Sequence, residues 1–325
     1  MLAMVETGAS PRANSHSRIE GRRPGGDALA FLLPVLPTRI ALLASSRYVI
    51  AVVNQKGGVG KTTTAVNLAA CLAASERPTL LIDFDPQANA SSAYGISNVE
   101  RQVYDALIDG MALTHCALET ELETLHVVPA GRDLVGAEIE LVSIEAREYR
   151  LDQSIRALGD AYEIILIDCP PSLGLLTLNA LTAADAVLIP LQCEYYALEG
   201  LANLTETIEL VRAQLNTKLE IQGIVLTMVD QRNNLARQVE AEVRSHFGEK
   251  VYRTRIPRNV RLSEAPSHGQ PILLYDIHSK GASAYVKLAD ELLSQLALTS
   301  PPRKPPVLPT PQVSFPSGGR NEPTP

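Results

Sequence analysis

The chain is poor in cysteine, and its four cysteines lie far apart. No C-x-x-C pair occurs among them, and no histidines stand at metal-ligand spacing. The sequence therefore argues against a disulfide framework and against a zinc site. We expect all four thiols to be buried as small apolar side chains in a reducing cytoplasm. The cysteines are Cys71, Cys116, Cys169 and Cys193.

The chain also lacks an overall positive charge and a long apolar run. Its formal net charge is −7, which argues against a protein coated in basic residues, although a local basic face can still bind nucleic acid. The most apolar stretch near the start, residues 28–46, is interrupted by Pro34, Pro37 and Arg39. Because a bilayer span needs about 20 mostly apolar residues, this stretch predicts neither a membrane helix nor export.

What the chain does have is room for a large core, with 325 residues of which 46% are hydrophobic. Its composition changes at both ends. Residues 1–27 are rich in Gly, Ser, Arg and Pro and show no apolar period, so we expect residues 1–46 to form a disordered leader. Residues 299–325 form a Pro-rich tail that we expect to be disordered. One folded domain is predicted between them, from residue 47 to residue 298.

Short apolar runs alternate with helical segments along this domain. Each run is apolar throughout, as in strands buried on both faces of a sheet. The alternation predicts an α/β fold, a doubly wound and mostly parallel sheet with helices on both faces and right-handed crossovers. The predicted strands lie in residues 48–54, 79–85, 125–130, 163–170, 186–191 and 221–229, and the clearest helices in 61–74, 198–215, 234–247 and 281–297.

One loop carries the strongest functional signal. The first predicted strand runs into Q-K-G-G-V-G-K-T-T, residues 55–63, and then into a helix, which is the context of a phosphate-binding loop. The glycines let backbone amides turn toward phosphate oxygens, and the positive end of the helix points to the same place. Lys61 would contact the β and γ phosphates, and Thr62 would ligate Mg²⁺. The predicted nucleotide ligands here are Lys56, Gly57, Gly58, Val59, Gly60, Lys61, Thr62 and Thr63.

A second lysine, Lys56, stands five residues ahead of Lys61. The sequence K-G-G-V-G-K-T-T resembles the deviant Walker A motif of the ParA/MinD family of dimeric P-loop ATPases. Residues 48–298 as a whole resemble the ParA/Soj group of that family, which partitions chromosomes and plasmids. The resemblance implies ATP and Mg²⁺ as cofactors, a homodimer with ATP, and a Lys56 that crosses to the nucleotide of the partner subunit. A cation shared across a triphosphate would make dimerisation depend on the nucleotide.

Aspartates follow two of the predicted strands, where doubly wound sheets bind ligands. The segment D-F-D-P-Q-A-N resembles the second signature of the family, which implies that Asp85 positions or activates the attacking water. Asp83 is expected to support the loop, and Gln87 and Asn89 belong to the switch segment that follows. Asp168 is the expected Walker B carboxylate at the Mg²⁺. No array of histidine and serine indicates covalent chemistry, so we expect hydrolysis by water that is slow without a partner.

The C-terminal half continues the resemblance. The segment I-P-R-N-V-R-L-S-E-A-P resembles the base-binding loop of the ParA/Soj group, which implies Pro257 and Asn259 near the adenine. Basic residues outnumber acidic ones from residue 230 to residue 261, and the resemblance assigns Arg232 and Arg261 to DNA binding. Contacts to phosphates would be independent of sequence and strongly salt-dependent. A mixed, solvated face with ordinary ion pairs is the open alternative.

The resemblance thus implies an ATP-dependent dimerising switch in the cytoplasm, at the nucleoid. The ATP dimer would bind double-stranded DNA nonspecifically and hydrolyse ATP under a ParB-type partner. A related ATPase that positions another cargo on the nucleoid is an open alternative.

Two further alternatives need features that the sequence does not favour. A MinD-like membrane-associated ATPase needs a terminal basic amphipathic helix, but residues 281–298 carry one lysine against Asp290 and Glu291. We therefore expect that helix to pack on the core and the protein not to use a membrane. An iron–sulfur ATPase needs paired cysteines at the dimer axis, whereas Cys169 directly follows Asp168.

Overall fold

The structure is a computed structural model that describes residues 47–230, 232–297 and 306–308. The predicted leader lies outside the described residues, and so does the predicted tail apart from residues 306–308. Neither prediction is tested.

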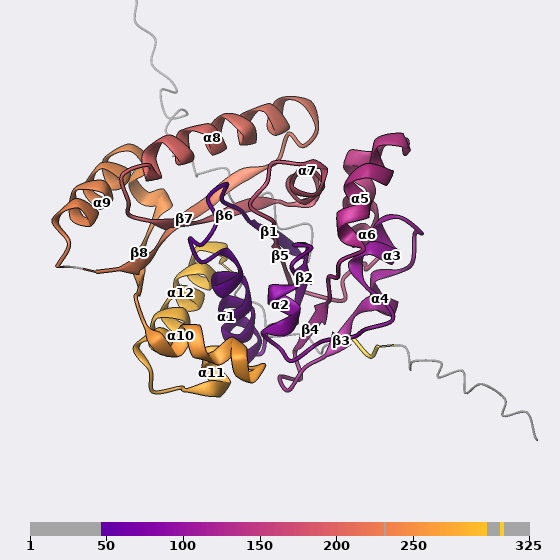
Figure 1. Cartoon of the computed structure of the whole chain (residues 1–325), viewed down its shortest axis with the longest axis horizontal. Coiled ribbons are helices and arrows are strands. Elements are labelled where there is room, and N and C mark those ends of the chain that lie inside the picture. Colours follow the sequence, from indigo (N-terminus) through magenta and orange to yellow (C-terminus); the bar gives the residue numbers. More distant parts are fainter. Residues whose placement is uncertain (1–46, 231, 298–305, 309–325) are drawn as a thin grey trace, which may run out of the picture. The chain divides into compact units, whose positions relative to one another are not determined.

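A single sheet organises the described chain (Figure 1). Its strands are β1 (Tyr48–Val52), β2 (Thr79–Asp83), β3 (Leu118–Glu119), β4 (Leu125–Val128), β5 (Ile164–Asp168), β6 (Ala186–Gln192), β7 (Glu220–Val229) and β8 (Val251–Pro257). Their order across the sheet is β3-β4-β2-β5-β1-β6-β7-β8. Every neighbouring pair is parallel except β3 with β4. Strands β2 to β5 lie on one side of β1 and strands β6 to β8 on the other, so the predicted doubly wound, mostly parallel sheet is confirmed.

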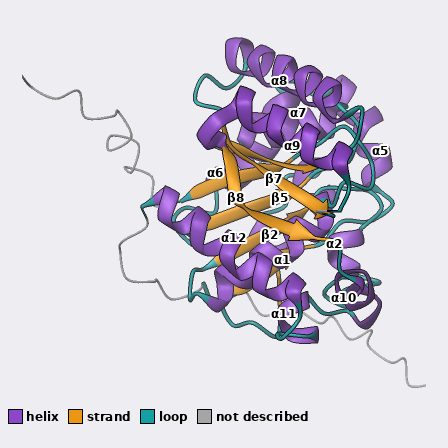
Figure 2. Ribbon diagram, turned by 90° about the vertical axis from the view of Figure 1, so that its left-hand side faces the viewer, coloured by secondary structure: helices purple, strands orange, loops and turns teal. Residues whose placement is uncertain are grey.

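Helices cover both faces of this sheet (Figure 2). In chain order they are α1 (Lys61–Ala74), α2 (Asn89–Ser92), α3 (Val103–Leu107), α4 (Leu113–Cys116), α5 (Leu134–Glu140), α6 (Arg150–Arg156), α7 (Leu175–Ala183), α8 (Ala197–Gln214), α9 (Asn234–Phe247), α10 (Val260–Glu264), α11 (Ile272–Tyr275) and α12 (Lys280–Leu296). The helices α1, α11 and α12 contribute to the core on one face, and α3, α5, α6, α7, α8 and α9 to the core on the other.

Strand β1 shows how the sequence builds two cores from one sheet. Its side chains alternate between faces, as the period of two in a strand requires. Ile50 and Val52 belong to the core beneath α1 and α12, while Val49 and Ala51 belong to the opposite core. The central strands are therefore buried on both sides, which is why they read as continuous apolar runs.

The predicted strands and the four predicted helices are all present, with ends shifted by a few residues. Two strands were missed. β3 has only two residues, too few to give a pattern. β8 lies at the edge of the sheet and exposes Arg253 and Arg255. Because these arginines interrupt the apolar residues, the segment was interpreted only as part of the basic region.

The last helix packs on the protein core, as expected. One face of α12 is buried, including Tyr285, Leu288 and Leu292. The Tyr285 hydroxyl lies 3.2 Å from the Thr64 hydroxyl on α1, which ties the two helices together. Within the described residues, no helix is both long and apolar enough to cross a membrane.

Candidate functional site

The loop between β1 and α1 has the backbone of a phosphate cradle. Gly58 and Gly60 have φ values of 75° and 87°, in the left-handed region where a side chain would be strained. A Cβ on Gly57 or Gly58 would meet no atom within 4 Å, so this side of the loop faces open space. Helix α1 starts directly after Gly60. The loop and the helix N-terminus together form a site suited to the phosphates of a nucleotide.

Polar residues from distant strands hold this loop in place. The Thr227 hydroxyl at the end of β7 donates to the Val59 carbonyl at 2.8 Å. The Asn54 side chain accepts from the Lys56 amide at 3.0 Å and donates to the Pro190 carbonyl at 2.7 Å. Sequence reasoning missed Asn54 and Thr227, because a polar residue at the end of a strand is not by itself a specific signal.

The two lysines of the loop have different environments. Lys61 is buried, and its ammonium group donates to the Lys56 carbonyl at 3.1 Å. Burial lowers the pKa of Lys61, while Asp168 and Asp85 oppose that shift. Lys56 instead is exposed and forms an ion pair with Glu194 of the same chain. Glu194 was also missed, because it lies far from the loop in sequence.

Asp168 is positioned as a ligand for a cation. It ends β5 and is completely buried, and neither carboxylate oxygen makes a hydrogen bond of normal geometry in the described part of the chain. Burial raises its pKa well above the usual value and neighbouring Asp83 adds to the shift, while the nearby Thr62 hydroxyl opposes it. A divalent cation would satisfy these oxygens. Mg²⁺ is typically held by one or two carboxylates together with phosphates and water, and Asp168 supplies one such carboxylate beside the phosphate loop.

Asp83 supports the loop that follows β2, as expected. Its carboxylate accepts from the Ser91 amide at 2.7 Å, the Ser91 hydroxyl at 2.6 Å and the Asp85 amide at 3.2 Å. Burial raises the pKa of Asp83 to about 6, although the hydrogen bonds from Ser91 oppose the shift. The same Ser91 hydroxyl accepts from the Ala130 amide at 3.1 Å. Ser91 thus joins the loop after β2 to the loop after β4.

Replacing Ser91 with alanine is expected to lower the free energy of unfolding by about 1–3 kcal/mol, because the change removes hydrogen bonds from a buried carboxylate and a buried amide. Urea denaturation followed by circular dichroism would measure it. Ser92→Ala is the matched control, since Ser92 is exposed and its hydroxyl bonds only to the Ala88 carbonyl. Equal effects of the two changes would contradict the role assigned to Ser91.

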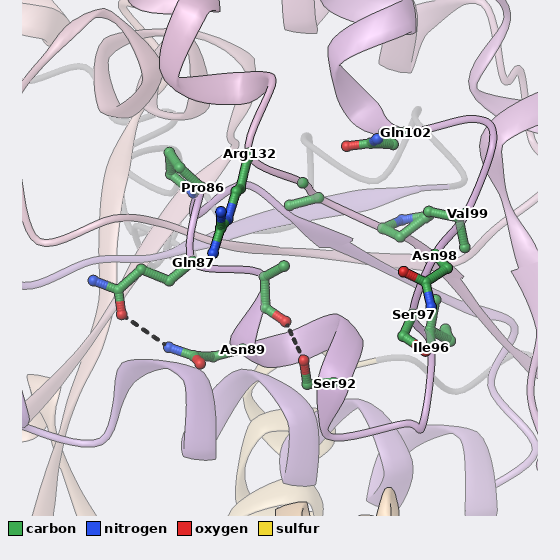
Figure 3. A pocket seen from close by; sticks show the side chains of 14 residues that line it. Pro86, Gln87, Asn89, Ser92, Ile96, Ser97, Asn98, Val99, Gln102 and Arg132 are labelled. Carbon is green, nitrogen blue, oxygen red and sulfur yellow. Dashed lines mark hydrogen bonds between the residues drawn. The ribbon is translucent and has the colours of Figure 1, made fainter.

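Asp85 lies where the loop after β2 turns toward α2. It is buried, and its carboxylate accepts from the Gln87 amide at 3.0 Å. Ala88 adopts a left-handed φ of 54°, and the Gln87 side chain accepts from Asn89 at 3.2 Å. Gln87 and Asn89 line a cavity of about 560 Å³, into which Arg132 also projects (Figure 3). The switch segment therefore contains one residue in an unfavourable backbone conformation. It also borders a cavity into which its side chains could move.

The predicted base-binding residues lie at and after the end of β8, the outermost strand of the sheet on the side away from β2. Pro257 ends β8 and pairs in register with Val229 of β7. The Asn259 side chain accepts from the Arg261 amide at 2.9 Å and so caps α10. Their placement near the adenine remains a prediction.

The two predicted DNA-binding arginines are exposed on separate elements. Arg232 follows β7 and pairs with Asp230, and Arg261 lies in α10 and pairs with Glu264 and Asp276. Other arginines of the basic region are ion-paired as well, since Arg244 and Arg255 share Glu240. Arg244 also donates to the Val251 and Tyr252 carbonyls. For Arg244, a structural role in the ion-paired face therefore fits better than a contact with DNA.

The four cysteines are free and buried, as expected. Cys71, Cys116, Cys169 and Cys193 lie on different elements. Burial raises the pKa of Cys116 and of Cys193 to about 11, so neither is a thiolate at neutral pH.

Comparison with known proteins identifies the family. A family model described as an AAA domain matches residues 47–221. The chain is 57% identical over 258 residues to the chromosome partitioning protein ParA of Myxococcus xanthus, covering 79% of this chain and 91% of that protein. The chain belongs to the ParA/Soj family. The present chain is also 57% identical over 246 residues to the sporulation initiation inhibitor protein Soj of Bacillus subtilis, covering 75% of this chain and 97% of that protein.

Solved structures place the ParA/Soj chain among ATP-using relatives. Cobyrinic acid a,c-diamide synthase from Mycobacterium smegmatis, crystallised with an ATP analog and magnesium, matches with a TM-score of 0.68 and 35% identity, over 80% of this chain and 98% of that one. The cell division ATPase MinD of Pyrococcus furiosus matches with a TM-score of 0.64 and 26% identity, over 76% and 98%. The chain is therefore a P-loop ATPase whose cofactors are ATP and Mg²⁺.

Proposed function

We propose that this ATPase is a dimerising switch for chromosome partition, which binds DNA as the ATP dimer and leaves it after hydrolysis stimulated by a ParB-type partner. The observation that carries this proposal is the second lysine of the phosphate loop. Lys61 already lies inside the cradle, whereas Lys56 stands outside it, exposed and paired with Glu194. The names of the relatives, ParA and Soj, support the same function.

Within one subunit, different residues would bind the phosphates, hold Mg²⁺ and position the attacking water. The amides of residues 57–63 and the Lys61 ammonium would hold the phosphates of ATP. Thr62 and Asp168 would hold Mg²⁺, which when bound neutralises charge on the transferring phosphoryl group. Asp85, fixed by the Gln87 amide, would orient the attacking water. Burial of Lys61 and the aspartates strengthens each of these electrostatic contacts.

Dimerisation would use the exposed lysine. In the proposed dimer, Lys56 leaves Glu194 and approaches the nucleotide of the partner subunit. Both side chains are about half exposed, and such ion pairs contribute at most about 1 kcal/mol. Breaking the ion pair between Lys56 and Glu194 therefore costs little free energy. Attraction between Lys56 and the triphosphate of the other subunit would offset this cost, and ADP has no triphosphate to provide it.

Contact with DNA would follow from dimerisation. One subunit presents Arg232 and Arg261, and a dimer presents twice that number of cations. Doubling the phosphate contacts steepens both affinity and salt dependence. The DNA-bound form would then be favoured by ATP without any new kind of contact, and nucleoid association would be its consequence in the cell.

Changing Arg232 and Arg261 together to alanine is expected to reduce ATP-dependent DNA binding at least about tenfold at moderate salt. The slope of log affinity against log salt should become shallower by about 3 to 4 for the dimer, because up to four phosphate contacts are removed. Fluorescence anisotropy with a labelled duplex would measure both. ATP-dependent dimerisation, followed by light scattering, should not change.

The matched control is Arg212→Ala on α8, which removes an exposed, ion-paired arginine outside the proposed face. An equal loss of DNA affinity in Arg212→Ala would mean that DNA binding depends only on the net charge of the protein. Full DNA affinity in the double variant would place the contact face elsewhere on the molecule.

A further inference from the structure

An apolar strip lies exposed along α5 and the short 3-10 turn that follows it, Leu141–Ser143. Val135, Ile139 and Val142 are 59%, 75% and 61% exposed. Their spacing of four and then three residues puts them on one side of the helix. Leu173, in the loop before α7, is 42% exposed as well. We call these four residues the α5 strip. Grouped aliphatic side chains exposed in this way are characteristic of interaction sites.

Exposed carboxylates stand beside this strip in the chain. Three of them have no ion-pair partner among the described residues, although Glu140 accepts from the Tyr104 hydroxyl. The arginines next to them in the sequence are Arg132 and Arg147, and Arg147 is already paired with Glu148. The strip therefore offers apolar contact beside a negatively charged rim, which complements lysine or arginine. The three carboxylates of the rim are Asp133, Glu140 and Glu145.

The strip lies next to the loop that follows Asp168. Leu173 and Gly174 belong to the loop that leads from Asp168 to α7. The Glu138 carboxylate of α5 lies against the backbone of Gly174, in the space that a Cβ on this residue would occupy. One oxygen of Glu138 is buried there without a hydrogen-bond partner in the described chain. Helix α5 itself follows β4, which runs parallel to β2, the strand that ends at Asp83. A ligand on α5 would thus press on the loop that starts at Asp168.

We propose that the α5 strip is the docking surface for a segment of the stimulating partner that carries lysines or arginines beside an apolar face. This inference rests on the proposed function, which requires such a partner, and it adds where that partner binds and by what chemistry. Binding would bury Ile139 and Val142 at the centre and place cations on the acidic rim. The contact between Glu138 and Gly174 would pass the effect to Asp168.

A second copy of the chain is a poorer occupant for the strip. Across a two-fold axis the same surface meets itself, so the acidic rims of two subunits would face each other. Like charges opposed in this way cost several kcal/mol in an interface. The charge of the rim therefore favours a basic partner over self-association.

The test uses the full chain and two synthetic helical peptides of about 18 residues, five turns of helix. One peptide carries leucine along one face with lysine on both flanks, and the other carries glutamate in place of lysine. Anisotropy should show that only the lysine peptide binds. Ile139→Ser combined with Val142→Ser should weaken it about tenfold or more. Leu210→Ser on α8 is the control, since Leu210 is an equally exposed aliphatic residue, and it should have no effect.

Charge reversal separates recognition from structural damage. Glu140→Lys with Glu145→Lys should weaken the lysine peptide and allow the glutamate peptide to bind, an exchange that misfolding would not produce. Stimulation of ATP hydrolysis by the ParB-type partner should fall with Ile139→Ser and Val142→Ser, while unstimulated hydrolysis and ATP-dependent DNA binding stay as in the wild type.

Three results would overturn the docking site. The first is that the lysine peptide does not bind the wild type, and the second is that the variant with Ile139→Ser and Val142→Ser keeps full stimulation by the partner. The third is that this variant loses ATP-dependent dimerisation before any partner is added, which would assign the strip to self-association. Failure of the proposed function looks different: the wild type would then show no ATP-dependent DNA binding and no stimulation, whatever the peptides do.

Discussion

Lys61→Ala is expected to weaken ATP binding about 100-fold or more and to abolish dimerisation, DNA binding and hydrolysis with it. The ammonium is buried in the cradle beside Asp168 and Asp85, so its loss removes the cation that neutralises the phosphates and leaves buried carboxylates without it. Truncating one partner of a buried charge pair costs about 2–5 kcal/mol. Isothermal titration calorimetry with ATP and Mg²⁺ would measure the change.

Lys56→Ala is the matched control, because it removes the same side chain five residues away in the same loop. This variant should bind ATP with nearly unchanged affinity but remain a monomer. Circular dichroism would show whether both variants keep the fold. ATP affinity at the wild-type level in Lys61→Ala would contradict the assignment of the loop, and normal dimerisation of Lys56→Ala would contradict the proposed crossing lysine.

Asp85→Ala is expected to slow ATP hydrolysis about 100-fold or more while ATP still binds. Positioned general-base groups contribute about 10²- to 10⁴-fold, and Asp85 is fixed in the turn by the Gln87 amide. Because the ATP dimer would form but not turn over, the variant should stay on DNA. Phosphate release and the dissociation rate from a labelled duplex, both with the partner present, would measure the two effects.

Asp85→Asn keeps the size of the side chain and serves as the companion variant. It should reproduce the loss of hydrolysis, whereas a purely steric role would leave turnover nearly intact. Undiminished turnover in both variants would refute the role of Asp85. The neighbouring Asp83 is a poor control, because its three hydrogen bonds hold the loop.

The phosphate loop and its aspartates were predictable from sequence because each signal is local. Gly57 to Thr63 form one continuous motif, and Asp83 and Asp168 each end an apolar run. The contacts that hold the site are not local. Thr227 reaches Val59, and Glu194 reaches Lys56, across more than a hundred residues of chain. No pattern within one segment predicts such pairs.

The parts of the fold that sequence reasoning missed share another cause. β8 is an edge strand with arginines on its exposed face, so no apolar run marks it. The α5 strip shows the reverse case, since Ile139 and Val142 are apolar residues that the structure places on the surface. Apolar patterning indicates burial, but it does not reveal which apolar residues are left for a partner.

ATP is expected to convert this protein into a DNA-bound dimer. Binding of the full chain to a nonspecific duplex should be measured with ATP, with ADP and without nucleotide, each across a salt series. We expect tight binding with ATP alone that weakens steeply as salt rises. Equal binding with all three, or no DNA binding by protein that demonstrably binds ATP, would mean that ATP does not drive this protein onto DNA.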